Sequence, residues 1–173
     1  MEIRKAAWED LGEIARLYDT LNDYLESHVN YPGWKKGIYP TEEDARKGIE
    51  ENALFVAVEQ GQIAGTFILR HTPEAAYAQV DWNCRLEDDQ VWVLYTFAVH
   101  LDFRHRGIGR GILRFIDRYA AETGAKAIRL DVYEKNSPAI ALYESMGYRY
   151  IGTVDLGYSA YGLDWFRLYQ KIL

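Results

Sequence analysis

Residues 91–99, VWVLYTFAV, form a nearly continuous run of nine apolar residues. Such a run is typical of a β-strand that is buried on both faces of a sheet. The next segment, 100–111, contains three glycines, and the apolar residues over 108–122 recur with the spacing of an amphipathic helix. The alternating residues 127–133, AIRLDVY, indicate another strand. The order of these segments predicts a strand-helix-strand crossover between parallel strands.

Other strands and helices are expected on both sides of this crossover, and most of the strands before it are expected to be antiparallel. Strands are predicted at 2–6, 54–60, 63–71, 76–82, 148–154 and 164–172, and helices from Trp8 to Leu25, from Thr41 to Asn52 and from Ser137 to Ser145. Ser137 is expected to cap the last of these helices, with Pro138 at its first position. The pattern predicts a mixed α/β (α+β) fold, and 173 residues suit one domain spanning 1–173.

Composition and charge narrow the class of function. The single cysteine, Cys84, excludes an internal disulfide and a cysteine-rich zinc site, and it favours a reducing compartment. No apolar run suggests a signal peptide or a membrane span. The net charge of −6 argues against general nucleic-acid binding. Residues 100–118, however, carry a local charge of +3, which leaves −9 for the remainder and predicts a discrete anion site.

The glycine-rich turn is the expected location of that anion site. A helix N-terminus exposes unpaired backbone N–H groups and the positive end of the helix dipole, and Arg104 and Arg106 add charge before it. A nucleoside-triphosphate loop is disfavoured because no Lys-Ser/Thr pair follows the glycines. A dinucleotide-binding loop would need a third glycine where Ile112 stands, although Asp131 lies where a ribose-binding acid is expected. The turn therefore predicts a phosphate or pyrophosphate ligand.

Two segments of the sequence match known motif patterns. Residues 104–109, RHRGIG, match [QR]-x-x-G-x-[GA], between an apolar strand and an amphipathic helix. Residues 136–152, NSPAIALYESMGYRYIG, are similar to N-x-x-A-x-x-L-Y-x-x-x-G-[FY]. In these two motifs the chain resembles the GNAT superfamily of acyl-CoA-dependent N-acetyltransferases. The resemblance implies a single GNAT-like domain with a mostly antiparallel central sheet, a splayed strand pair and flanking helices.

The resemblance also implies a site for acetyl-CoA, with no metal. The pyrophosphate would rest on the turn formed by Arg104, His105, Arg106, Gly107, Ile108, Gly109 and Arg110. The pantetheine arm would pair, like an added strand, with the backbone of Phe97, Ala98 and Val99. Asn136 resembles the family's cofactor-contacting asparagine, and Tyr143 resembles the tyrosine near the CoA sulfur. A tyrosine hydroxyl suits the role of a proton donor to the leaving thiolate.

The resemblance implies transfer of an acetyl group to a primary amine of a small molecule or peptide, by direct attack in a ternary complex. The general base is left open among Glu26, His28, Asp81 and Tyr95. The aromatic segment from Tyr18 to Tyr39 is expected either to form a wall of the acceptor site or to cover the sheet as an apolar lid. Nucleic acid and membrane are not expected partners, a homodimer is left open, and a cytoplasmic location is expected. The alternatives are a non-catalytic acyl-CoA-binding or regulatory module and a nucleotide-dependent oxidoreductase.

Overall fold

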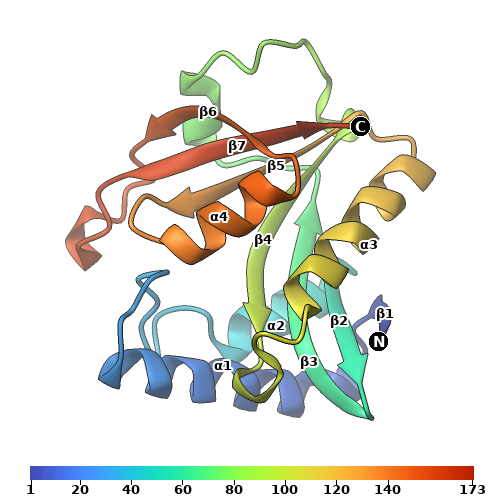
Figure 1. The fold of residues 1–173 in the computed structure, drawn as a ribbon, viewed down its shortest axis with the longest axis vertical. Coiled ribbons are helices and arrows are strands. Elements are labelled where there is room, and N and C mark those ends of the chain that lie inside the picture. The colour runs from blue at the N-terminus through green and yellow to red at the C-terminus, as the bar shows by residue number, and fades with distance from the viewer. The chain divides into compact units, whose positions relative to one another are not determined.

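The computed structural model describes residues 1–173 as seven strands and four α-helices (Figure 1). The strands are β1 (Glu2–Lys5), β2 (Leu54–Glu59), β3 (Gln62–Arg70), β4 (Val91–Val99), β5 (Ala127–Tyr133), β6 (Arg149–Val154) and β7 (Phe166–Ile172). The helices are α1 (Leu11–Ser27), α2 (Glu42–Glu50), α3 (Ile108–Glu122) and α4 (Ser137–Ser145). The strand order is β1-β2-β3-β4-β5-β7-β6. The structure therefore confirms the predicted fold class.

Contacts between Cα atoms divide the chain into two compact units. The first unit comprises Met1–Asn30, Trp34–Leu69 and Thr96–Ile112, and the second comprises Tyr31–Gly33, Arg70–Tyr95 and Leu113–Leu173. Strand β4 and helix α3 each have residues in both units. No α-helix combines the length and the apolar character needed to cross a membrane.

In the first unit, helices pack on a three-stranded antiparallel arrangement of β1, β2 and β3. The β2–β3 hairpin turns at Gln60 and Gly61, which both have positive φ angles (54° and 78°), as a tight hairpin turn requires. On one face, the hydroxyl groups of Tyr18 in α1 and Thr66 in β3 lie 3.2 Å apart in a hydrogen bond. Helix α2 begins after Thr41, whose side chain accepts a hydrogen bond from the Asp44 amide in a capping box.

In the second unit, β4 and β5 form a parallel pair that does not extend along their full lengths. The paired register runs from Val91 opposite Ala127 to Leu94 opposite Leu130. Strand β4 continues to Val99, within the first unit, and β5 continues to Tyr133, so the pairing ends before either strand does. Strand β5 remains paired with β7 over its whole length, and β7 pairs with β6, both in the antiparallel sense.

Three local predictions are wrong. Residues 76–82 are not a strand, because the segment contains the 3₁₀ helix Ala75–Gln79, in which the consecutive Ala76 and Tyr77 are both buried. Strand β4 is not buried on both faces: Tyr95, Phe97 and Val99 are only partly buried, while the residues between them are buried. The N-cap of α4 is Asn136 rather than Ser137, since the Asn136 side chain accepts the Ala139 amide.

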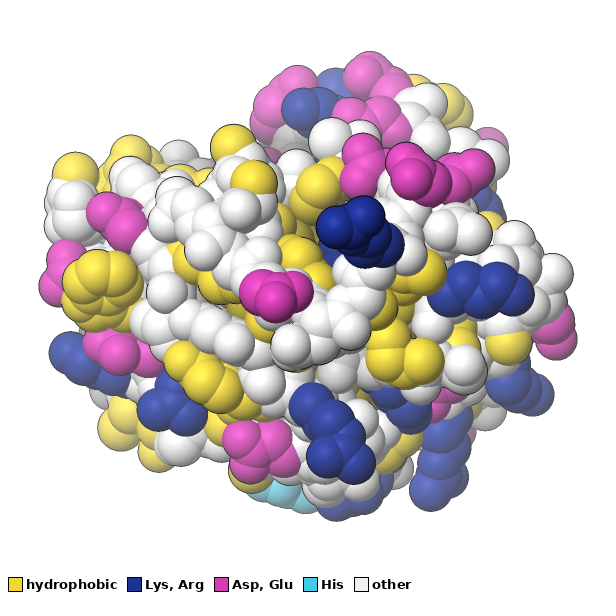
Figure 2. All heavy atoms as spheres, turned by 90° about the horizontal axis from the view of Figure 1, so that it is seen from above, with side chains coloured by type: hydrophobic (Ala, Val, Ile, Leu, Met, Phe, Trp, Pro, Cys, Tyr) yellow, Lys and Arg dark blue, Asp and Glu magenta, His cyan; other side chains and the backbone are white.

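Charged side chains of both signs lie on the face seen in Figure 2, with acidic side chains gathered at its upper right margin. The chain as a whole carries a net charge of −6, but its acidic and basic side chains are not evenly mixed on this face. A chain with a net negative charge repels anions at long range, so an anionic ligand needs a local concentration of donors and positive charge.

Candidate active site

The turn that precedes α3 has the backbone geometry of an anion site. His105 and Gly107 have φ angles of 61° and 80°, in the left-handed region that glycine adopts without strain. A Cβ atom added at Gly107 would meet no heavy atom within 4 Å, so the space beside its backbone is open. The Gly111 amide donates to the Gly107 carbonyl at 2.9 Å. The amides of residues 108–110 come before this bond, in the first turn, where helix geometry provides no acceptor.

Arginine side chains surround this turn. Arg104, Arg106 and Arg110 are all exposed. The Arg104 guanidinium lies 4.4 Å from the ring centre of Tyr24 in α1, and the Arg106 guanidinium lies 5.3 Å from the ring centre of Phe103. These cation–π contacts hold two positive charges near the N-terminus of α3, where the helix dipole adds to them. The turn can therefore attract and bind a phosphate group.

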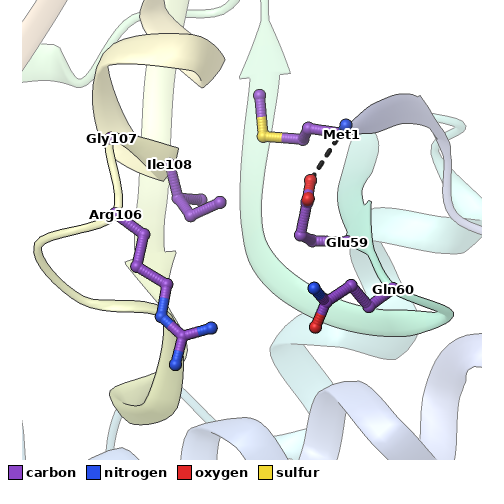
Figure 3. A pocket seen from close by; sticks show the side chains of 6 residues that line it. All are labelled: Met1, Glu59, Gln60, Arg106, Gly107 and Ile108. Carbon is purple, nitrogen blue, oxygen red and sulfur yellow. Dashed lines mark ion pairs between the residues drawn. The ribbon is translucent and has the colours of Figure 1, made fainter.

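A small cavity of about 250 Å³ borders the turn in the first unit (Figure 3). Arg106, Gly107 and Ile108 line one side, and Met1, Glu59 and Gln60 line the other. The Glu59 carboxylate pairs with the amino group of Met1 at 2.9 Å. The volume lies below the roughly 300–1,000 Å³ of typical ligand pockets. The cavity could therefore accommodate only part of a ligand that binds at the turn.

The last residues of β4 lie immediately before the turn and beyond the point where β4 pairs with β5. Phe97 and Val99 are partly buried, and Ala98 is buried. A Cβ atom at Gly65 in β3 would come within 2.8 Å of the Ala98 carbonyl oxygen, so glycine at this position permits a close approach to β4. The backbone at Ala98 thus lies close against β3, in the part of β4 that extends beyond its pairing with β5.

Asn136 and Tyr143 lie in the second unit, whereas residues 97–110 lie in the first. Tyr143 is buried in α4, and burial raises the pKa of its hydroxyl well above the ordinary value, with a further contribution from the charge of Asp131. A tyrosine with a raised pKa stays protonated at neutral pH and can act as a hydrogen-bond donor. The Asn136 Oδ1 atom accepts the Ala139 amide at 3.4 Å, so this side chain has a capping role that the sequence analysis assigned to Ser137.

Asp131 is a candidate that the sequence analysis did not place in an acetyltransferase site. It is the first β5 residue after the last β4–β5 pair, and the Tyr77 hydroxyl donates a hydrogen bond to its Oδ2 atom at 2.8 Å. Burial raises the pKa of Asp131 to about 6, and the Tyr77 hydrogen bond opposes this rise. A half-buried carboxyl group with a raised pKa is a candidate proton acceptor. In the sequence, an acidic residue within the mostly apolar strand segment AIRLDVY was the one sign of a functional carboxyl group at Asp131.

The four earlier base candidates have other surroundings. Glu26 and His28 are exposed at the end of α1, and the exposed Asp81 accepts a hydrogen bond from the Asn83 amide in a loop. Tyr95 is partly buried, and its hydroxyl donates to the Thr72 carbonyl at 2.8 Å. Glu26, His28 and Asp81 are thus open to solvent, and the Tyr95 hydroxyl already has an acceptor.

The aromatic segment divides between the core and the surface. Tyr18 is fully buried under the sheet, so it belongs to the core and not to an acceptor wall. Tyr24, Trp34 and Tyr39 are partly buried in the first unit, and the rings of Trp34 and Tyr39 meet edge to face with centres 5.9 Å apart. Tyr31 belongs to the second unit and is 40% exposed. The rings of Tyr24, Trp34 and Tyr39 thus leave part of their aromatic surface accessible in the first unit.

The sequence pattern that defines the acetyltransferase (GNAT) family matches residues 14–148 of the chain. An uncharacterised N-acetyltransferase of Methanocaldococcus jannaschii, MJ1207, is 28% identical over 137 residues, which cover 75% of this chain but only 57% of that relative. An uncharacterised N-acetyltransferase of Bacillus subtilis, YhfO, is 26% identical over 164 residues, which cover 95% of this chain and 97% of the relative.

Solved structures show the same fold at low sequence identity. A GNAT-family acetyltransferase from Streptococcus agalactiae matches with a TM-score of 0.81 and 22% identity, covering 99% of this chain and 95% of that one. A ribosomal-protein-alanine N-acetyltransferase from Brucella melitensis matches with a TM-score of 0.73 and 22% identity over the full length of both chains. At these identities the likeness concerns the fold.

Proposed function

Because the chain belongs to the acetyltransferase (GNAT) family, we propose that it transfers an acetyl group from acetyl-CoA to a primary amine of a small molecule or peptide. The observation that carries this proposal is the geometry that follows the β4–β5 ladder. The ladder ends at Leu94 and Leu130, and β4 continues into an exposed glycine turn at the N-terminus of a helix. Such a strand end and turn provide main-chain groups for an extended ligand with a diphosphate.

Acetyl-CoA would bind mainly through the backbone. The amides of the turn, residues 104–110, would hold the diphosphate, with the nearby arginines adding charge. Residues 97–99 of β4 would bind the pantetheine arm as an additional strand. Asn136, whose Oδ1 atom caps α4, would offer its Nδ2 group to the cofactor. This assignment requires no metal ion.

Transfer requires an uncharged amine and a protonated leaving group. An alkylamine with a pKa of about 10.4 is mostly protonated at neutral pH, so a base must accept a proton from it. Asp131 would take this proton, directly or through water, because burial raises the pKa of its carboxyl group to about 6. The amine nitrogen then bonds to the thioester carbonyl carbon, the carbon–sulfur bond breaks, and Tyr143 donates its proton to the departing sulfur. The cytoplasm supplies both substrates in this scheme.

The acceptor side offers aromatic and acidic groups. Tyr24, Trp34 and Tyr39 provide partly buried rings in the first unit, and Glu26 is exposed at the end of α1. Rings and carboxylates of this kind attract a cationic amine before it loses its proton. One structural neighbour is named for acetylating a ribosomal-protein alanine, so a peptide N-terminus belongs among the acceptors to be tested.

The proposal predicts thiol release from acetyl-CoA that depends on an added amine. The assay uses the purified chain with a panel of polyamines, aminoglycosides, amino acids and peptides, and follows free CoA with a thiol reagent. Tyr143→Phe should slow turnover by about 10²–10⁴-fold, because the sulfur loses its proton donor, while acetyl-CoA affinity stays near that of the wild type. Tyr150→Phe is the matched control, since Tyr150 is 52% exposed in β6.

Two results would contradict the proposal in different ways. Acetyl-CoA binding without turnover on any amine would support the non-catalytic acyl-CoA-binding module instead. An absence of acetyl-CoA binding would overturn the assignment of the glycine turn itself. If Tyr143→Phe matched the wild type in turnover, the proton would reach the sulfur from another group.

A further inference from the structure

A short hydrogen bond joins the aromatic segment to the middle of β4. The hydroxyl oxygens of Tyr39 and Thr96 lie 2.5 Å apart, and both residues belong to the first unit. Thr96 is only 8% exposed, so its hydroxyl group has little access to water. Loss of the Tyr39 hydroxyl would leave a buried polar group without this partner, which is costly.

Thr96 also has an unusual backbone conformation. Its φ angle is 47°, in the left-handed region, although a β-branched residue rarely adopts such an angle. This conformation is strained and persists only where surrounding contacts hold it. The next residues along β4 are 97–99, which the proposed function assigns to the pantetheine arm. The Thr96 conformation therefore determines the direction in which those backbone groups point.

Tyr39 is itself well anchored on the side of the aromatic segment. The Asn22 Nδ2 group in α1 donates to the carbonyls of Tyr39 and Pro40 at 3.4 and 3.3 Å. The backbone groups of Lys35 and Tyr39 also exchange two hydrogen bonds of 3.1 and 2.9 Å. Residues 34–40 thus form a hydrogen-bonded segment. The Tyr39 hydroxyl bonds this segment to Thr96 of β4, so a change in one can alter the conformation of the other.

We infer that Tyr39 is a positioning residue for the cofactor strand. Its hydroxyl holds Thr96 in the left-handed conformation, and this sets residues 97–99 for the pantetheine arm. Because the same side chain belongs to the segment 34–40, acetyl-CoA binding and the order of this segment are coupled. The inference rests on the proposed function, since it takes residues 97–99 as the cofactor-binding edge.

The test compares Tyr39→Phe with Tyr18→Phe. Each variant removes one tyrosine hydroxyl that bonds a threonine hydroxyl in the first unit, but Tyr18 bonds Thr66 in β3. Titration calorimetry with acetyl-CoA should show binding about five- to tenfold weaker in Tyr39→Phe, which corresponds to the loss of about one hydrogen bond. Tyr18→Phe should bind acetyl-CoA within about twofold of the wild type, even where it lowers thermal stability.

Hydrogen exchange provides a readout that a purely structural role would not change. Acetyl-CoA should slow exchange of the amides of residues 34–40 in the wild type and in Tyr18→Phe. In Tyr39→Phe, saturating acetyl-CoA should leave exchange in this segment unchanged, because the hydroxyl connection is missing. Equal protection in all three proteins would overturn the coupling.

A second substitution tests the role of Thr96. Glycine adopts positive φ angles without strain, so Tyr39→Phe combined with Thr96→Gly should bind acetyl-CoA more tightly than Tyr39→Phe alone. If Tyr39→Phe alone binds as tightly as the wild type, or if the double variant binds no better than the single one, the inference fails while the proposed function stands. If the wild type itself does not bind acetyl-CoA, the proposed function fails first.

Discussion

Asp131 is the residue whose ionisation should govern the pH dependence of the reaction. Its pKa is raised to about 6, mainly by burial, and it can accept a proton only when ionised. We therefore expect kcat/KM to rise with pH through an apparent pKa near 6. Asp131→Asn should remove this rise of kcat/KM with pH, which is the acidic limb of the pH–rate profile. It should also lower the rate by about 10²–10⁴-fold, because asparagine cannot accept the proton. The measurement is a pH–rate profile with acetyl-CoA and a reactive amine.

Tyr77 and protein stability provide two controls on this assignment. Tyr77→Phe removes a hydrogen bond that stabilises the ionised carboxyl group of Asp131, so the acidic limb of the pH–rate profile should move to higher pH. Folding raises the pKa of Asp131 from 3.8 to about 6, because the folded state favours the protonated carboxyl group. Its contribution to stability is therefore fully present below about pH 3.8 and is lost as the pH rises through about 6. Asp131→Asn, which cannot ionise, should therefore gain stability relative to the wild type at pH 8, by about 1–3 kcal/mol. An unchanged pH–rate limb in Asp131→Asn would exclude it as the base.

The sequence predicted some of these residues and not others, for physical reasons. Gly107 and Tyr143 lie in motifs of fixed spacing, and the family resemblance of these motifs predicts a place beside the cofactor for both. The environment of Asp131 depends on Tyr77, which is 54 residues away and folds over the sheet in a 3₁₀ helix. A pKa raised by burial cannot be read from local sequence, because burial is decided by segments distant in the chain.

At the scale of the element, the two ends of α3 carry glycines with the same backbone requirement. Gly107 before the helix and Gly124 after it have φ angles of 80° and 81°, and an added Cβ atom would meet nothing within 4 Å at either position. Alanine at each position should therefore cost a similar amount of stability, about 1 kcal/mol. Only Gly107→Ala should also weaken acetyl-CoA binding, by about tenfold or more, because its methyl group would occupy the space beside the turn amides.

Thermal unfolding and acetyl-CoA titration of both variants check this expectation. Wild-type acetyl-CoA affinity in Gly107→Ala would contradict the placement of the diphosphate at the turn. Comparable losses of affinity in Gly107→Ala and Gly124→Ala would indicate a general effect on α3 instead.

Elements with strong periodicity were predicted well, and elements that depend on distant packing were not. The amphipathic spacing of α3 predicts its range of 108–122 directly. The segment 76–82 has the pattern of a strand, yet its first residues fold in the 3₁₀ helix Ala75–Gln79. Tyr77 in this helix and Trp82 after it pack into a cluster with residues of β4, β5 and β7. The expectation of a splayed strand pair came from the family resemblance, since no residue pattern within either strand marks the end of the β4–β5 pairing at Leu94.

At the scale of the whole molecule, β4 and α3 each contribute residues to both compact units. Unfolding one unit alone would break a strand and a helix in the middle, where their hydrogen bonds form cooperatively. We therefore expect one cooperative thermal transition, with equal calorimetric and van't Hoff enthalpies, as for a single domain. Differential scanning calorimetry of the full chain measures both enthalpies, and two resolved transitions would contradict the prediction of one domain over 1–173.

Acetyl-CoA should shift this single transition as a whole. A ligand that binds only the native state at 100 times its Kd adds about 2.7 kcal/mol to the free energy of unfolding. NAD and ATP also carry phosphates, but the chain lacks the third glycine of a dinucleotide loop and the Lys-Ser/Thr pair of a triphosphate loop. At equal concentration they should leave the midpoint nearly unchanged. A larger shift with NAD than with acetyl-CoA would favour the oxidoreductase alternative, because the native state would then be selecting a dinucleotide.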